Sequence, residues 1–115
     1  MEKYFEELPI AITVCDREGK CLDLNQKSVK VNCKTDDKSL IGKNLLDCHP
    51  EPARTKFLGQ LQTPTINAYT IEKNGVKKLI YQTPWYENGE HMGQVEFSIE
   101  IPFEMPHYVR KPKTE

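Results

Sequence analysis

The sequence lacks long apolar runs and a strong net charge. No apolar stretch approaches the roughly 20 residues that cross a bilayer, and the acidic N-terminus, MEKYFEELPI, is unlike a signal peptide. The 16 Lys and Arg residues nearly balance the 17 Asp and Glu residues, so no overall field attracts nucleic acid or anionic membranes. We therefore expect a cytoplasmic protein without membrane or nucleic-acid partners.

Motifs of catalysis and of metal binding are also missing. The chain contains no G-x-S-x-G, no H-E-x-x-H and no phosphate loop, so we expect no enzyme activity. Its four cysteines form no C-x-x-C pair and match no common zinc framework: Cys15, Cys21, Cys33 and Cys48. We expect free, largely buried thiols and no metal site. A redox or metal role for Cys48 beside His49 stays an open alternative.

The first half of the chain predicts a short helix and then a hairpin. Tyr4, Phe5 and Leu8 form one apolar edge of a helix that is too short to be stable alone, so it must dock on its own domain or on a second copy. Residues 10–24 predict a β-hairpin around a D-R-E-G turn. Asn25 suits a helix N-cap. The run that follows fits both strand and helix periods, so periodicity leaves it open.

The centre of the chain carries its longest helical pattern. After a polar loop over residues 34–39, residues 40–46 predict a short turn of helix. Ala53, Phe57 and Leu61 recur every four residues and predict an amphipathic helix that ends near Gln62.

The second half predicts three strands, over residues 65–73, 76–86 and 91–103, joined by two Asn-Gly turns. The last strand alternates between an apolar set (Val95, Phe97, Ile99, Ile101) and a polar set (Gln94, Glu96, Ser98, Glu100). We expect the apolar set to be buried and the polar set to face water. The pattern predicts an α+β domain in which the central helices cover the apolar face of one antiparallel sheet.

Motifs over residues 8–103 resemble the PAS domain family in their order and spacing. LPIAITVCDREGKCLDLNQKS resembles the family's opening, a strand, a D-x-x-G turn and a second strand that ends in Asn. IGKN (residues 41–44) resembles the IG-x-N segment, and HPE (residues 49–51) resembles the start of the long helix. PWYENGEHMGQVEFSIEIP resembles the closing hairpin.

The resemblance implies a PAS fold, a five-stranded antiparallel sheet of order 2-1-5-4-3 with helices packed on one face, and a helix over residues 26–34. It also implies a sensory or signalling module that binds a small ligand between sheet and helices. Such a module acts through a homodimer or a separate signalling partner. The alternative is a ligand-free module used only for dimerisation and protein interaction.

Flavin and haem are two cofactors of PAS domains whose binding residues can be compared with this sequence. The cofactor of this chain stays unknown. Light-sensing members carry a Cys directly after the Asn of G-x-N-C, whereas Leu45 follows Asn44 here, so flavin photochemistry is rejected. Haem-binding members generally place a His within the long helix, which has none here. His49 at the helix start is therefore expected to be structural, with haem as an open alternative that Cys48 or His49 would have to ligate.

Aromatic side chains either line a ligand pocket or fill the core. The pocket candidates are Tyr81, Trp85, Tyr69, Phe57 and Phe97, with Cys48 and His49 at the helix start. Tyr81 and Trp85 are favoured because their polar groups need partners, and the guest is expected to be hydrophobic or aromatic. A cavity of about a few hundred Å³ with converging polar groups would support ligand binding.

The end of the chain bears on how a signal would leave it. Pro102 and Pro106 interrupt the helix through which most signalling PAS domains pass on their state. An initiating Met and a charged tail suggest a complete chain, although a piece of a longer protein stays an alternative. We expect a signal to pass by association, with Tyr4, Phe5 and Leu8 as the dimer surface. The expected divisions are a helical cap (1–8), the PAS domain (9–103) and an extended tail (104–115).

Overall fold

The computed structural model describes residues 1–33 and 37–113, so part of the loop predicted over residues 34–39 lies outside the described residues. The elements, in chain order, are α1 (Lys3–Glu6), β1 (Ile10–Asp16), β2 (Cys21–Leu24), α2 (Gln26–Asn32), the 3₁₀ helix η1 (Leu45–Cys48), α3 (Ala53–Gln62), β3 (Asn67–Lys73), β4 (Val76–Glu87) and β5 (Glu90–Ile101). The run that periodicity left open is helical, as the resemblance implied.

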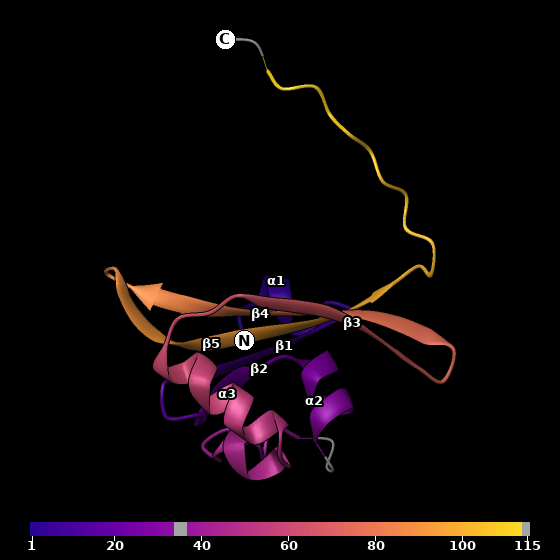
Figure 1. The fold of residues 1–115 in the computed structure, drawn as a ribbon. Coiled ribbons are helices and arrows are strands. Elements are labelled where there is room, and N and C mark those ends of the chain that lie inside the picture. Colours follow the sequence, from indigo (N-terminus) through magenta and orange to yellow (C-terminus); the bar gives the residue numbers. More distant parts are fainter. Residues whose placement is uncertain (34–36, 114–115) are drawn as a thin grey trace.

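The five strands form one antiparallel sheet in the order β2-β1-β5-β4-β3, so the predicted strand order is confirmed. Figure 1 shows α2 and α3 together against one face of the sheet and α1 on its opposite side. After β5 the chain leads away from the sheet, and residues 102–113 contain no helix or strand. In the part of the chain that the structure describes, no helix is long and apolar enough to cross a membrane.

Asn25 joins α1, β1 and α2 to one another. Its side chain is fully buried, and its Oδ1 accepts hydrogen bonds from the backbone N–H groups of Ile12 (3.0 Å) and Ser28 (3.1 Å). Its Nδ2 donates to the carbonyl oxygens of Phe5 (2.8 Å) and Ile10 (2.7 Å). The predicted helix N-cap is therefore confirmed. The same amide also holds α1 and β1 against the start of α2.

The long helix α3 is held at its two ends. Near its start, the guanidinium of Arg54 donates to the carbonyl oxygen of Leu46 in η1 at 2.8 Å. At its other end, Arg17 of the β1–β2 turn donates to the carbonyl oxygens of Leu61 (3.3 Å) and Gln62 (3.2 Å). A cation at a helix C-terminus satisfies the last carbonyl groups and complements the helix dipole. These contacts tie α3 to η1 and to the β1–β2 turn.

The helices cover the face of the sheet that carries the polar set of β5, so the prediction that they cover the face with its apolar set is wrong. Gln94, Glu96 and Ser98 of β5 line a cavity beneath the helices. The apolar residues between them point to the opposite side, which we call the back face (Ile10, Ile12, Val14, Leu79, Tyr81, Val95, Phe97 and Ile99). Ile12 is buried, and the other seven side chains are partly or largely exposed. Strand alternation separates two sets of residues, but it does not say which set meets the helices.

Two apolar clusters lie between the helices and the sheet, and each contains a buried thiol. Cys15 packs with Leu46, Phe57 and Leu61, and Cys21 packs with residues that include Leu24. Burial raises the pKa of the Cys15 thiol to about 12 and that of the Cys21 thiol to about 11. All four cysteines are free thiols as predicted, but Cys33 is only partly buried and Cys48 is exposed.

We predict that replacing Asn25 will destabilise the fold more than replacing its neighbour. Asn25→Ala removes four hydrogen bonds, two accepted from buried N–H groups and two donated to backbone carbonyl oxygens. It should lower the free energy of unfolding in urea by about 3 kcal/mol or more. The exposed neighbour Gln26 provides the matched control, and Gln26→Ala should change the same quantity by less than about 0.5 kcal/mol. A loss below about 1 kcal/mol for Asn25→Ala would contradict this account.

We also predict that the thiols react in order of exposure. At pH 8 the raised pKa keeps Cys15 and Cys21 protonated, and the thiolate is the reactive form. Iodoacetamide should therefore label Cys48 first and Cys33 more slowly, and it should reach the other two only after unfolding in urea. Peptide mass spectrometry measures each rate. Labelling of folded Cys15 as fast as Cys48 would show that the core is not closed.

Candidate functional site

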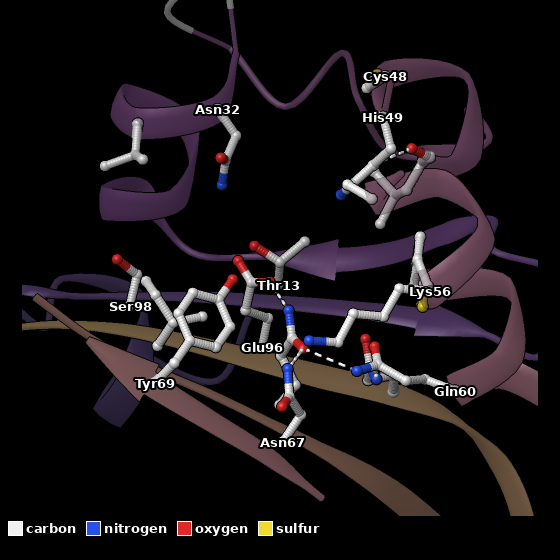
Figure 2. Close-up of a pocket in the computed structure, with 18 of the residues that line it drawn as sticks. Thr13, Asn32, Cys48, His49, Lys56, Gln60, Asn67, Tyr69, Glu96 and Ser98 are labelled. Atoms are coloured by element: carbon white, nitrogen blue, oxygen red, sulfur yellow. Dashed lines mark hydrogen bonds between the residues drawn. The ribbon is translucent and has the colours of Figure 1, made fainter. Parts of the chain in front are cut away.

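A cavity of about 530 Å³ lies between the helices and the sheet. Its floor is the covered face of β1, β3, β4 and β5, and α2, η1 and α3 contribute to its walls. Figure 2 shows Cys48 and His49 on the helical side and Thr13, Tyr69, Asn67 and Glu96 on the sheet side, with open space between them.

Five side chains on the cavity floor and wall are connected by hydrogen bonds. Gln94 Nε2 donates to Gln60 Oε1 (3.1 Å), Gln60 Nε2 donates to Gln82 Oε1 (3.2 Å), and Gln82 Nε2 donates to Glu96 Oε2 (2.8 Å). Asn67 Nδ2 also donates to Gln82 Oε1 at 3.0 Å. We call these five residues the amide chain. Because Gln60 lies on α3 and the other four lie on the sheet, the chain ties helix and sheet together while it lines the cavity.

Tyr69 and Lys56 stand at the open side of the cavity, on β3 and α3. Both are exposed, and Lys56 Nζ lies 5.8 Å from the centre of the Tyr69 ring, within reach of a cation–π interaction. Partial burial raises the pKa of Tyr69 above its ordinary value, and the negative charge of Glu96 contributes to the rise. The phenol of Tyr69 and the carboxylate of Glu96 are therefore close enough to interact electrostatically.

A second polar group lies where α2 meets β1. The hydroxyls of Thr13 and Ser28 share a hydrogen bond of 2.5 Å, and Asn32 Nδ2 donates to Ser28 Oγ at 3.1 Å. Thr13 and Asn32 both line the cavity. The covered face is thus polar at this corner as well.

Cys48 and His49 line the cavity from the helical side, and their contacts are local. His49 Nδ1 is hydrogen-bonded to the carbonyl oxygen of Leu45 at 2.6 Å, and its ring lies 5.0 Å from that of Phe57. These contacts support the structural role expected for His49. Among residues 1–33 and 37–113, no group of three or more His, Cys, Asp or Glu side chains could hold a metal ion.

The structure divides the predicted pocket residues into two sets. Tyr69, Phe57, Cys48 and His49 line the cavity, whereas Tyr81, Trp85 and Phe97 do not. Tyr81 and Phe97 are paired on the back face, on the side of the sheet away from α2 and α3. The polar groups of Tyr81 and Trp85 made them the favoured candidates. The indole N–H of Trp85 instead donates to the carbonyl oxygen of Cys15 at 2.9 Å.

Trp85 lies opposite a position in β5 where only a glycine fits. It pairs with Gly93, where a Cβ atom would come within 1.9 Å of the carbonyl oxygen of Cys15. Trp85 thus contributes to the packing of β1, β4 and β5 rather than to the cavity.

The reasoning from the sequence missed the amide chain and Lys56. The signal was present, because Gln94, Glu96 and Ser98 alternate along β5, but an alternating polar set was assigned to water. Gln60 gave no signal of its own, because a single Gln in a helix is ordinarily exposed.

The residues predicted for a dimer surface lie away from the cavity. Tyr4 is 71% exposed and Phe5 is 47% exposed, and Leu8 is partly buried. They lie on or beside α1, on the opposite side of the sheet from α2 and α3 (Figure 1). The partly exposed back face adds further apolar side chains that a partner could cover.

Three solved structures illustrate the structural similarity. The chain has 18% sequence identity and a TM-score of 0.58 to the Aer2 receptor of Vibrio cholerae, described as a dual PAS-heme oxygen sensor, with 81% of this chain and 95% of that chain covered. The PAS domain of BvgS from Bordetella pertussis has 20% sequence identity and a TM-score of 0.61, with 86% of this chain and 82% of that chain covered. The VqmA dimer of Vibrio cholerae has 18% sequence identity and a TM-score of 0.62, with 95% of this chain and 55% of that chain covered. At these identities the similarity shows the fold.

Comparisons of the sequence itself were made with curated proteins and with family profiles. A search of curated proteins gives no match. The sequence profile of the family described as PAS fold matches residues 5–64, just over half of the 115 residues. This segment contains the Asn25 cap, the residues 41–44 and 49–51 that carried the resemblance, and the helices above the cavity. The chain therefore belongs to the PAS-fold family.

Proposed function

We propose that this protein is a sensory PAS module that binds a small molecule in the cavity between α3 and the sheet, without catalysing a reaction. The observation that carries the proposal is the cavity itself. Its volume of about 530 Å³ lies within the range of ligand sites. Apolar side chains such as Phe57 and Ile80 line it together with the polar amide chain. This combination of apolar surface and a few placed polar groups is typical of small-molecule pockets.

The amide chain supports a site that is already formed before a ligand arrives. The side chains of Gln60 and Gln94 are buried and hydrogen-bonded to each other. A ligand therefore does not have to order these groups, which reduces the entropic cost of binding. The Aer2 receptor, whose fold is similar, is described as a PAS-heme oxygen sensor. That description supports a sensory role for this chain but not the same ligand.

Filling the cavity tests the proposal. Native mass spectrometry of protein purified from its own host should show a bound small molecule. Ser98→Phe places a ring in the cavity and should abolish the extra mass, while the protein stays folded by circular dichroism. Thr70→Phe, which adds the same ring on the opposite face of β3, should retain it. Wild-type protein with only the mass of the polypeptide, or an extra mass that persists in Ser98→Phe, would contradict ligand binding at this site.

We further propose that the module acts by association in the cytoplasm, as a homodimer or with a separate signalling partner. The exposed edge of α1 and the partly exposed back face support this proposal, because covering apolar surface favours association. The VqmA structure with a similar fold is described as a dimer, which also supports it. Transmission by these surfaces without a ligand is the alternative function.

Phe5 is the residue with which to test self-association. Phe5→Glu places a charge on the exposed edge of α1 and should convert a dimer into a monomer in analytical ultracentrifugation. The control is Tyr108→Glu, because Tyr108 is an aromatic residue of the tail and is 71% exposed. It should remain dimeric. A monomeric wild-type protein, or a dimeric Phe5→Glu variant, would argue against this surface.

A further inference from the structure

Glu96 offers an unused hydrogen-bond acceptor to the cavity. Its Oε2 accepts from Gln82, but within residues 1–33 and 37–113 no protein group bonds its Oε1. Oε1 is not among the buried side-chain atoms that lack a partner, so it stays accessible to a guest. A carboxylate only accepts hydrogen bonds. A molecule that binds Oε1 must therefore bring a donor.

The amide chain holds this acceptor in a defined orientation. Donation runs in one direction, from Gln94 to Gln60 to Gln82 and finally to Glu96. The carboxylate is thus fixed through one oxygen while the other stays free. A fixed acceptor favours a ligand with one donor at the matching position.

Tyr69 and Lys56 define the rest of the guest. The ring of Tyr69 lines the cavity and interacts with the charge of Glu96, so a flat molecule bound to Glu96 would lie against an aromatic face. The ammonium group of Lys56 lies over the same ring, and among residues 1–33 and 37–113 it forms no hydrogen bond or ion pair. A cationic guest would meet this ammonium group at the open side, and an anionic guest would meet Glu96.

We propose that the cavity selects a small, planar, neutral molecule that carries both an N–H donor and an oxygen acceptor. The N–H donates to Glu96 Oε1, the oxygen accepts from Lys56, and the ring lies against Tyr69. This inference rests on the proposed function and names the class of its ligand. The sequence led us to expect a hydrophobic or aromatic guest, and the proposed class departs from the hydrophobic alternative.

Four small probes and two variants test the selectivity by NMR titration of ¹⁵N-labelled protein. Uracil carries both N–H donors and carbonyl oxygens, and it should shift resonances of Tyr69, Gln82 and Glu96 with a Kd on the order of 1 mM. 1,3-Dimethyluracil, which has lost its N–H groups, should bind at least about tenfold more weakly. Toluene and the benzylammonium ion should also bind more weakly than uracil.

The two variants test whether uracil binding depends on the carboxylate of Glu96 in particular or on any carboxylate of β5. Glu96→Gln still accepts from Gln82 but removes the charge, and it should weaken uracil binding by about tenfold or more. Glu100→Gln, four residues further along β5 and on the same face, should leave uracil binding unchanged. Unaltered uracil affinity in Glu96→Gln would overturn the inference, and so would toluene or benzylammonium binding as tightly as uracil. The native-mass test of Ser98→Phe is independent of these probes, so ligand binding at the cavity can stand even if this ligand class is wrong.

Discussion

The amide chain of Gln94, Gln60, Gln82, Glu96 and Asn67 is the interaction on which the cavity depends. Buried amide and carboxylate groups are unfavourable unless they are hydrogen-bonded. Here each of the five forms at least one such bond, and Gln60 carries the connection from the sheet to α3. Together with the apolar cluster of Cys15, Phe57 and Leu61, these hydrogen bonds hold α3 on the sheet while a cavity remains between them.

The same arrangement explains why this sheet has an unusual distribution of polarity. The covered face of β5 is polar and the back face is apolar but only partly buried. A domain that satisfies its polar groups internally leaves its apolar face to be covered by α1 or by another chain. The proposed binding in the cavity and the proposed association on the back face therefore involve opposite sides of the same strands. A change in one strand can affect both.

Much of the fold could be predicted because short-range rules determine it. The Asn25 cap, the spacing of Phe57 and Leu61 and the Asn-Gly turns each act over a few residues, and each is found where expected. The candidate site was predicted less well. Phe57, Tyr69, Cys48 and His49 line the cavity, but the residues that were favoured, Tyr81 and Trp85, do not.

The sequence by itself determined the elements of this chain, their antiparallel pairing through the resemblance, and the division of each strand into two alternating sets. Only the tertiary structure decided which set faces α3. The physical reason is that alternation has a period of two and no direction. The choice depends on bonds between distant residues, such as Gln60 with Gln94, 34 positions apart. A polar face can be buried only when side chains of another element form hydrogen bonds with it. The local sequence pattern does not predict these hydrogen-bond partners.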